Sequence, residues 1–267
     1  MLIKAIEQDK ANILDYLKTE PIYNLFLIAD INQFGLENEF MKTFVIKENN
    51  KIASVILIYG TTLLFFDPKN LIDNELLNNL IIEHNVKNVN ISDKMFAKHQ
   101  EFFTNQAERF QIHEQFLAKC DKKTMENSPE VKKAEYSDVP GIVESRMQID
   151  EFAQFRSNFD KELVVYQENF KRGISNNFII VDQEKNIVIA HAMISAKTDQ
   201  VAMVGGVYCL PNYRNCGYGT KVTTALTNFI IDNNMIAMLF YHNEKAGSIY
   251  KKIGYEIFGK VYTVALK

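Results

Sequence analysis

The chain has 267 residues, of which 47% are hydrophobic and 24% are charged, as in folded globular proteins. This composition excludes a disordered or fibrous chain. The net charge of −3 argues against a dedicated nucleic-acid binder, which would carry a basic patch. Three cysteines are too few for a disulfide framework, and the length favours two domains over one.

The N-terminal segment 1–18 carries a charge every few residues and lacks the apolar core of a signal peptide. No uncharged apolar run reaches the roughly 18 residues that a membrane-spanning helix needs. We therefore expect a cytoplasmic protein that has no membrane partner.

Apolar spacing in the first half predicts helices at 9–18 and 22–31. The β-rich runs that follow predict strands at 41–48, 52–59 and 62–66. Further on, the pattern predicts a helix after Pro68, a strand at 89–91, a helix at 93–105 and a strand at 110–119. The segment 121–130 is polar and contains a proline, which is typical of a linker. The predicted domains are therefore residues 1–120 and 131–267.

The second half repeats this order of elements. Helices are predicted at 137–149, 160–172 and 244–253, and a further helix carries the apolar stripe Val222, Ala225, Leu226, Phe229 and Ile230. Strands are predicted at 177–182, 187–195, 201–210 and 236–241, with one or two more at 255–266. Gly205 and Gly206 interrupt one strand, which indicates a bulge or a close backbone approach. The shared order suggests an internal duplication.

The segment 213–220, YRNCGYGT, lies between a predicted strand and an amphipathic helix. Gly217 and Gly219 free the backbone to turn so that several N–H groups face one point. Together with the positive end of the helix, these groups form an anion site suited to a pyrophosphate. Arg214 can add a charge-assisted contact, and Thr220 can cap the helix. A P-loop or a Rossmann fingerprint fits worse, because the order and number of glycines differ.

The segment 205–230 resembles the acetyl-CoA-binding motif of the GNAT N-acetyltransferase superfamily, a strand that leads through V-x-P-x-x-R-x-x-G-x-G into a helix. Arg214, Gly217 and Gly219 keep the family spacing, although three residues separate Val207 from Pro211. The segment 243–259 resembles the family's next motif, and the matching positions are Asn243, Ala246, Tyr250, Gly254 and Tyr255. The resemblance covers about residues 131–267.

The resemblance implies an α/β (α+β) fold of tandem GNAT-like domains, each a mixed, mostly antiparallel sheet flanked by helices. The first half lacks a glycine and an arginine after Pro68, and Phe103 stands roughly where the second half has Tyr250. It is therefore similar to the degenerate partner domain of two-domain members such as the glycine N-acyltransferase-like proteins. Its aromatic residues could line an acceptor pocket or belong to the core; they are Tyr16, Tyr23, Phe26 and Phe34.

By resemblance, the protein passes an acetyl group from acetyl-CoA directly to a primary amine of a small molecule or amino acid. The implied acetyl-CoA-binding residues are Val207, Tyr208, Cys209, Arg214, Asn215, Cys216, Gly217, Tyr218, Gly219, Thr220, Asn243 and Ala246. Tyr250 is the implied catalytic residue, because its phenol can donate a proton to the departing thiolate. The alternative is that Tyr250 is packed in an apolar helix stripe.

The general base is not identified, because the strand before the loop has no carboxylate. Candidate substitutes are His191, Tyr208, Asp150 and Glu151, and an amine that is already deprotonated needs no strong base. Cys209 and Cys216 lack a recognisable activating partner, so a thiol nucleophile is not favoured. The five histidines show no metal-ligand spacing, so we expect no metal.

Two functions thus follow from the sequence. The first is an N-acetyltransferase with a small amine acceptor, acting as a monomer or homodimer without nucleic-acid partners. The second is a non-catalytic CoA-binding sensor or interaction module. The missing strand carboxylate keeps this alternative open.

Overall fold

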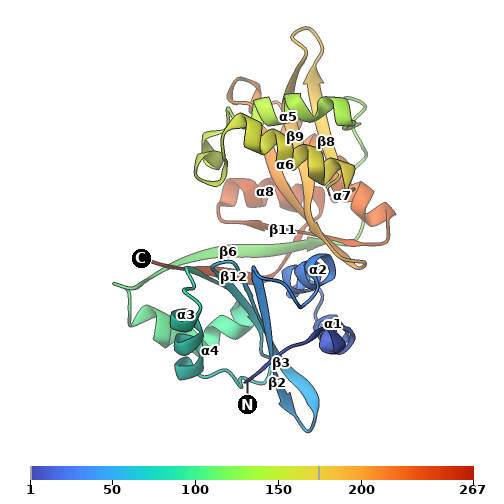
Figure 1. Ribbon diagram of the computed structural model, residues 1–267. Helices are drawn as coiled ribbons and strands as arrows, with labels where there is room; N and C mark the ends of the chain where they lie inside the picture. The colour runs from blue at the N-terminus through green and yellow to red at the C-terminus, as the bar shows by residue number, and fades with distance from the viewer. Residues whose placement is uncertain (1, 174) are drawn as a thin grey trace. The chain divides into compact units, whose positions relative to one another are not determined.

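The computed structural model describes residues 2–173 and 175–267 and has a mixed α/β fold (Figure 1). The chain divides into two compact units. The first unit comprises Met1–Leu117, Phe240–His242 and Ile257–Lys267, and the second comprises Ala118–Leu239 and Asn243–Glu256. Each unit contains mostly antiparallel strands flanked by helices, which confirms the predicted fold class. Among the described residues, no helix has the length and apolar character needed to span a membrane.

The strands of the first unit follow the order β1-β2-β3-β4-β5-β12-β6. Their bounds are β1 (Leu2–Lys4), β2 (Met41–Glu48), β3 (Lys51–Tyr59), β4 (Thr62–Phe66), β5 (Asn88–Ser92), β6 (Phe110–Cys120) and β12 (Glu256–Leu266). Strands β1 to β4 pair antiparallel in sequence order, β4 pairs parallel with β5, and β5 pairs antiparallel with β12.

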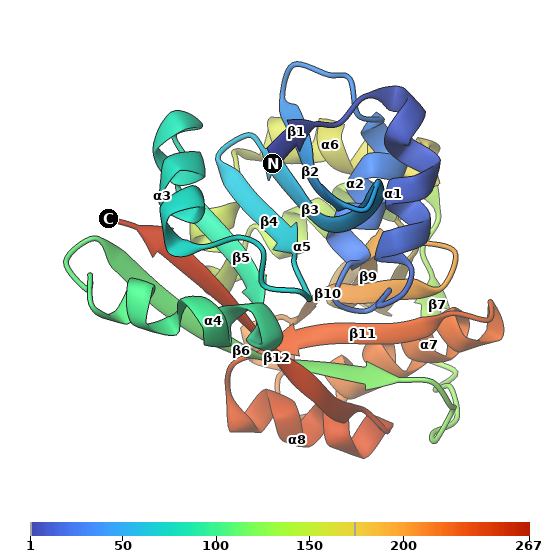
Figure 2. The same cartoon turned by 90° about the horizontal axis from the view of Figure 1, so that it is seen from below.

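Helices cover both faces of these strands (Figure 2). Their bounds are α1 (Lys10–Leu17), α2 (Leu25–Phe34), α3 (Asn74–Glu83) and α4 (Asp93–Thr104). One hydrophobic cluster joins α1 and α2 to β2 and β3, and another joins α3 and α4 to β3, β4 and β5. The first unit therefore has two cores, one on each face of its sheet.

Strand β12 belongs to the first unit although it ends the chain. Residues 261–265 pair with β5, Val264 is fully buried in the first unit's core, and Tyr262 stacks on Phe96 with ring centroids 3.9 Å apart. The predicted domain 131–267 includes this last strand, whereas in the structure residues 257–267 belong to the first unit. The alternation of a strand shows which faces it buries but not which neighbour it pairs with.

The strands of the second unit follow the order β11-β10-β9-β8-β7. Their bounds are β7 (Lys132–Lys133), β8 (Asn177–Asp182), β9 (Ile187–Lys197), β10 (Val201–Cys209) and β11 (Ile236–Tyr241), of which Phe240 and Tyr241 fall in the first unit. The helices are α5 (Val139–Arg146), α6 (Phe159–Lys171), α7 (Tyr218–Asp232) and α8 (Glu244–Ile253). Helix α7 packs on β8, β9 and β10, and α5 packs on β9 and on α6.

Both units place one parallel pair after a series of antiparallel pairs. The parallel pairs are β4–β5, connected by α3, and β10–β11, connected by α7. This common pattern agrees with the suggested duplication. The predicted helices and strands are confirmed within a few residues at their ends, whereas the short strands β1 and β7 have too few residues to produce a pattern.

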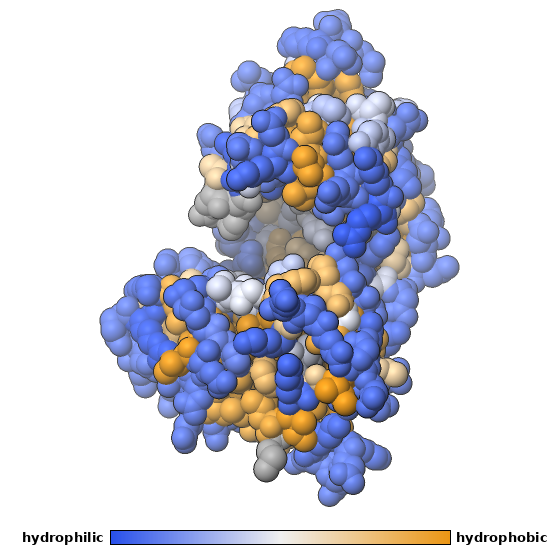
Figure 3. All heavy atoms as spheres, viewed as in Figure 1, coloured by the Kyte–Doolittle hydropathy of each residue, from blue (hydrophilic) through white to orange (hydrophobic). Residues whose placement is uncertain are grey.

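Helix α6 is amphipathic, and its outer face is partly apolar. Asn158 begins the helix by accepting a hydrogen bond from the N–H group of Lys161 at 3.0 Å. Phe159, Val164 and Val165 are exposed, and apolar side chains are visible over this helix (Figure 3).

The predicted bulge at the paired glycines is confirmed. Gly205 is opposite Met193 and Tyr208 is opposite His191, so two residues of β10 face a single residue of β9. Gly206 has a φ of +56°, which favours glycine, and a Cβ atom on Gly205 would collide with the Ser195 hydroxyl. Glycine is therefore favoured at position 206 by the backbone conformation and at position 205 by the close approach of the Ser195 side chain.

Candidate functional site

A cavity of about 420 Å³ lies in the second unit, where the end of β10, the loop that follows it and the starts of α7 and α8 meet. The structure brings together every predicted site residue except Cys216. The lining includes Val207, Tyr208, Cys209, Arg214, Asn215, Gly217, Tyr218, Gly219, Thr220, Asn243, Ala246 and Tyr250. Cys216 is exposed, and its Sγ atom faces the carbonyl oxygen of Arg214. The roles given to these residues remain predictions.

The loop after β10 turns sharply into α7. Asn215 and Gly217 have φ values of +67° and +79°, and Gly217 is the residue that precedes the first turn of the helix. Thr220 was expected to cap α7, and this expectation is wrong. Thr220 lies within the first turn, and the position that a capping side chain would take belongs to Gly217. The free N–H groups of this first turn therefore have no side-chain cap at the N-cap position.

The reason for a glycine at position 219 differs from the reason at position 217. It lies in the first turn of α7 without a positive φ, and a Cβ atom there would meet no atom within 4 Å. Neither the backbone nor the packing of the described residues therefore requires glycine at this position. A ligand that approaches the helix N-terminus closely would require it, as a bound phosphate group does.

Strand β10 is open along part of one edge. Its parallel pairing with β11 covers Val201–Met203 and Ile236–Met238, whereas its pairing with β9 continues to Cys209. Val207, Tyr208 and Cys209, which line the cavity, come after Met203, the last residue of β10 that pairs with β11 in the described part of the chain. Their backbone groups are therefore placed to pair with an extended ligand, in the way that a peptide adds to a sheet edge.

Helix α8 supplies another wall of the cavity. The side-chain oxygen of Asn243 accepts a hydrogen bond from the Ala246 N–H group at 2.8 Å and so caps this helix. Tyr250 is half-buried on the same helix, and its ring makes an edge contact with Tyr255 at 5.9 Å. Burial raises the pKa of Tyr250 above its ordinary value. The hydroxyl group therefore keeps its proton at neutral pH, as a proton donor must.

Arg214 carries a charge into the cavity but already has a partner. Its Nε atom donates to the carbonyl oxygen of Cys209 at 3.2 Å, and its Nη2 atom lies 3.0 Å from the carboxylate of Glu151. The pKa of Glu151 is lowered by a hydrogen bond from its own backbone and by Arg214. The guanidinium group that was predicted to contact phosphate is thus already paired with a carboxylate of the protein.

The candidates for a general base lie in different places. Glu151 lines the cavity, whereas Asp150 and His191 are not in its lining. His191 is fully buried, and burial lowers its pKa to about 4. Tyr208 lines the cavity, but its hydroxyl donates to the Ile142 carbonyl at 3.0 Å and burial raises its pKa. Of the four, only Glu151 presents a carboxylate to the cavity.

The Cys209 thiol is not activated as a nucleophile. Burial raises the pKa of the Cys209 thiol, whereas a nucleophilic cysteine needs a lowered pKa. Its Sγ atom lies 3.3 Å from the carbonyl oxygen of Tyr213. Within residues 2–173 and 175–267, no group of three or more His, Cys, Asp or Glu side chains could hold a metal ion.

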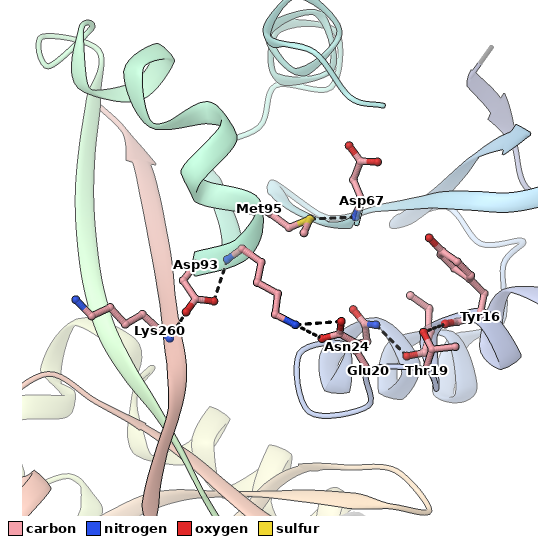
Figure 4. Close-up of polar contacts among 10 residues, drawn as sticks. Tyr16, Thr19, Glu20, Asn24, Asp67, Asp93, Met95 and Lys260 are labelled. Carbon is pink, nitrogen blue, oxygen red and sulfur yellow. Dashed lines mark hydrogen bonds and ion pairs between the residues drawn. The ribbon is translucent and has the colours of Figure 1, made fainter. Parts of the chain in front are cut away.

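The loop after β4 in the first unit is filled by a side chain of the protein itself. The carboxylate of Asp67 is buried and accepts hydrogen bonds from the N–H groups of Leu71 at 3.0 Å and Ile72 at 2.8 Å. The Ser54 hydroxyl donates to it at 2.5 Å, and the Asp67 N–H group donates to the sulfur of Met95 (Figure 4). These two N–H groups of the loop are therefore bound by an internal carboxylate and are not available to an external anion.

The aromatic residues suggested for an acceptor pocket make separate contacts within the first unit. The Tyr16 hydroxyl donates to the carbonyl oxygen of Ala53, Tyr23 packs on Phe258, Phe26 packs on Phe240, and Phe34 packs on Phe40 and Tyr59. Phe103 is fully buried in the core next to Phe96. These contacts account for packing, and an acceptor role for these residues remains a prediction.

Sequence reasoning missed several residues of the cavity lining: Ile149, Phe152, Tyr213, Lys245 and Ile249. Ile249 and Lys245 lie in the predicted helix of the second motif, so their position could have suggested them. Ile149 and Phe152 come from a segment more than 50 residues before the phosphate loop. No local pattern connects that segment to the loop.

Residues 145–255 match the model of the Acetyltransferase (GNAT) family. This part of the chain is therefore a GNAT domain, and it contains all residues that line the cavity. Comparison with curated protein sequences gives no match. The family match supports acyl transfer as the general type of reaction.

Solved structures resemble the whole chain. A GCN5-related N-acetyltransferase from Sphaerobacter thermophilus has a TM-score of 0.68 at 10% identity, covering 100% of this chain and 95% of that one. A GNAT-family acetyltransferase from Colwellia psychrerythraea has a TM-score of 0.61 at 14% identity, with both chains fully covered. A tandem GNAT protein from the clavulanic acid biosynthesis pathway has a TM-score of 0.64 at 10% identity, covering 100% and 98%. At such identities the likeness shows the fold, which is that of tandem GNAT proteins.

Proposed function

We infer that the protein is an N-acetyltransferase, which transfers an acetyl group from acetyl-CoA to a primary amine of a small molecule or amino acid. The observation that carries this proposal is the open space at Gly219. A glycine that the protein's own structure does not require, at the start of a helix in a GNAT domain, is explained by close approach of a phosphate group.

The residues present fit acetyl-CoA along the length of the cavity. The first-turn N–H groups of α7 and the guanidinium of Arg214 would hold the pyrophosphate. The open edge of β10 at 207–209 would pair with the amide groups of the pantetheine arm. Tyr250, on α8, lines the same cavity.

The chemistry needs one proton donor and one acceptor. The amine nitrogen bonds to the thioester carbonyl carbon, the carbon–sulfur bond breaks, and the thiolate takes a proton. Tyr250 would donate that proton from its hydroxyl, which its raised pKa keeps protonated. The proton released by the amine would pass to water, or to Glu151 once this carboxylate has left Arg214.

One observation favours the second candidate, a non-catalytic CoA-binding sensor. The carboxylate that lines the cavity, Glu151, is tied to Arg214 and is not on strand β10. Such a site can bind acetyl-CoA without a dedicated base for the amine. The two functions therefore differ in turnover, not in binding.

Calorimetric titration with acetyl-CoA and a thiol-release assay over a panel of amines would separate the candidates. If the protein is an N-acetyltransferase, the wild type binds acetyl-CoA and turns over at least one amine, and Gly219→Glu loses acetyl-CoA binding. Binding without turnover of any amine would support the sensor. No binding by the wild type would overturn both proposals.

A further inference from the structure

The buried core of the second unit contains one imidazole ring with two polar partners. His191 on β9 has no exposed surface, its Nδ1 atom lies 2.8 Å from the carbonyl oxygen of Gly206, and its Nε2 atom lies 2.9 Å from the side-chain amide of Asn177 on β8. The ring also stacks on Tyr208 with centroids 5.1 Å apart. A polar group in such a place is costly unless its hydrogen bonds are made, so these contacts hold the ring in one position.

We propose that His191 is a positioning residue for the ligand cavity, because it holds the Gly206 carbonyl toward β9 and so fixes the bulge that directs Val207, Tyr208 and Cys209 at acetyl-CoA. This inference rests on the proposed function for its ligand. Its structural part, the state of the ring and of the bulge, does not depend on any ligand.

The bulge is the first step of the argument. Gly206 lies at the point where β10 has one more residue than β9, and its φ of +56° turns its peptide group out of the regular ladder. The carbonyl oxygen thereby loses a regular strand partner and needs a donor. His191 supplies that donor from the adjacent strand. Because the three residues after Gly206 line the cavity, the orientation of this one peptide sets which of their backbone groups face a ligand.

The protonation state of the ring is the second step. A carbonyl oxygen can only accept a hydrogen bond, so Nδ1 must carry a proton. Burial lowers the pKa of His191 to about 4, the hydrogen bond with Gly206 opposes this shift, and the charge of Arg146 on α5 acts in the same direction as burial. The ring is therefore neutral, and Nε2 must accept. In the structure Asn177 places its Oδ1 atom toward Nε2 and donates from its NH₂ group to the Ser175 hydroxyl at 3.3 Å. Because the oxygen and nitrogen of an amide are assigned from the hydrogen-bond network, a neutral ring with its proton on Nδ1 requires this amide to be turned by 180°, so that the NH₂ group donates to Nε2 and the oxygen accepts from Ser175.

Nuclear magnetic resonance of the full chain tests this assignment without a ligand. Two-bond ¹H–¹⁵N spectra should show His191 as the neutral tautomer with its proton on Nδ1. The ring should not titrate between pH 5.5 and 8. A proton on Nε2, or a titration midpoint near 6.5, would overturn the proposal.

Two substitutions at one position test the consequence for binding. His191→Asn keeps an NH₂ group near the place of Nδ1, whereas His191→Leu removes the donor. We expect His191→Leu to raise the acetyl-CoA Kd about tenfold, which corresponds to the loss of one or two backbone hydrogen bonds. The Kd of His191→Asn should stay within about threefold of the wild-type value. His113→Leu, at an exposed histidine in the first unit, is the matched control.

The outcomes separate this proposal from the proposed function. If the wild type does not bind acetyl-CoA, the function fails, and the tautomer together with amide exchange at 207–209 in the two variants still tests the role of His191. Equal effects of His191→Asn and His191→Leu on Kd or on amide exchange would show a general packing role and overturn the proposal. If His191→Leu does not fold, rescue in His191→Asn and the ring spectrum decide the question.

Discussion

The guanidinium group of Arg214 lies 3.0 Å from the carboxylate of Glu151, and both residues line the cavity of the second unit. Glu151 belongs to a short 3₁₀ segment, Asp150–Phe155, far from Arg214 in the sequence. Both side chains are largely exposed, so the pair contributes little to stability. The pair matters for ligand binding, because a phosphate group that binds Arg214 must displace the Glu151 carboxylate or share the guanidinium group with it.

Replacing Glu151 by glutamine should therefore strengthen acetyl-CoA binding. The substitution removes a negative charge that competes with phosphate for Arg214. Because the pair is exposed, we expect the Kd to fall by only about two- to fivefold. Calorimetric titration at low and high salt would measure it, and the gain should shrink as salt screens the charges. Asp150→Asn, an adjacent carboxylate outside the cavity lining, is the control. Weaker binding in Glu151→Gln would mean that Glu151 contacts the ligand favourably.

The two glycines of the phosphate loop should respond differently to alanine. Gly219→Ala should leave the free energy of unfolding unchanged or raise it by up to about 1 kcal/mol, because alanine favours a helix. Gly217→Ala should lower it by about 1 kcal/mol or more, since φ is +79° there. Both variants should bind acetyl-CoA less well than the wild type. Denaturant titration and calorimetry together would check this, and full affinity in Gly219→Ala would remove the main support for the phosphate site.

Tyr250→Phe should lower kcat about 100-fold while the acetyl-CoA Kd changes little, because phenylalanine keeps the ring and loses the proton. Burial raises the pKa of Tyr250, so the wild-type donor is protonated at and below neutral pH. Its contribution to kcat is lost only as pH rises through that raised pKa. A pH profile of kcat for both proteins would show this. Equal rates would assign Tyr250 to packing alone.

His99 should make the stability of the first unit depend on pH. It is buried and lies 2.7 Å from Asn74, and burial lowers its pKa to about 4 from the model-peptide value of 6.5. Between these values the unfolded chain binds a proton that the folded chain does not. Stability is therefore fully present above pH 6.5 and falls as pH drops toward 4, by about 2 kcal/mol at pH 5.

His99→Gln is the matched variant for this effect, since it keeps a polar side chain near Asn74 and cannot titrate. Urea unfolding of both proteins at pH 7 and pH 5 would measure the difference. The variant should be less stable than the wild type at pH 7 and should lose less stability at pH 5. Parallel losses in the two proteins would show that His99 is not the group responsible.

The sequence predicted those local features that depend only on residues close to each other in the chain. The bulge at Gly205 and Gly206 and the motif that begins at Asn243 depend on short-range backbone chemistry, and the structure contains both. The exact cap of α7 was predicted wrongly. Thr220 has the right chemistry for a cap, but the turn at Gly217 starts the helix earlier.

Contacts between distant segments were out of reach of sequence reasoning. Nothing near Glu151 indicates that it meets Arg214, and His191 could not be distinguished from a catalytic base until its burial and its partners were known. In both cases the environment decides the role, because solvent exposure and neighbouring groups set a side chain's charge and freedom.

The sequence by itself determined the type of secondary structure along the chain and the loop suited to phosphate, because periodicity and glycine spacing act over a few residues. Only the tertiary structure decided that β12 pairs with β5 and that Asp67 fills the corresponding loop of the first unit. Strand pairing and burial join residues that are far apart in the chain. Their free energy depends on the whole fold and leaves no local pattern.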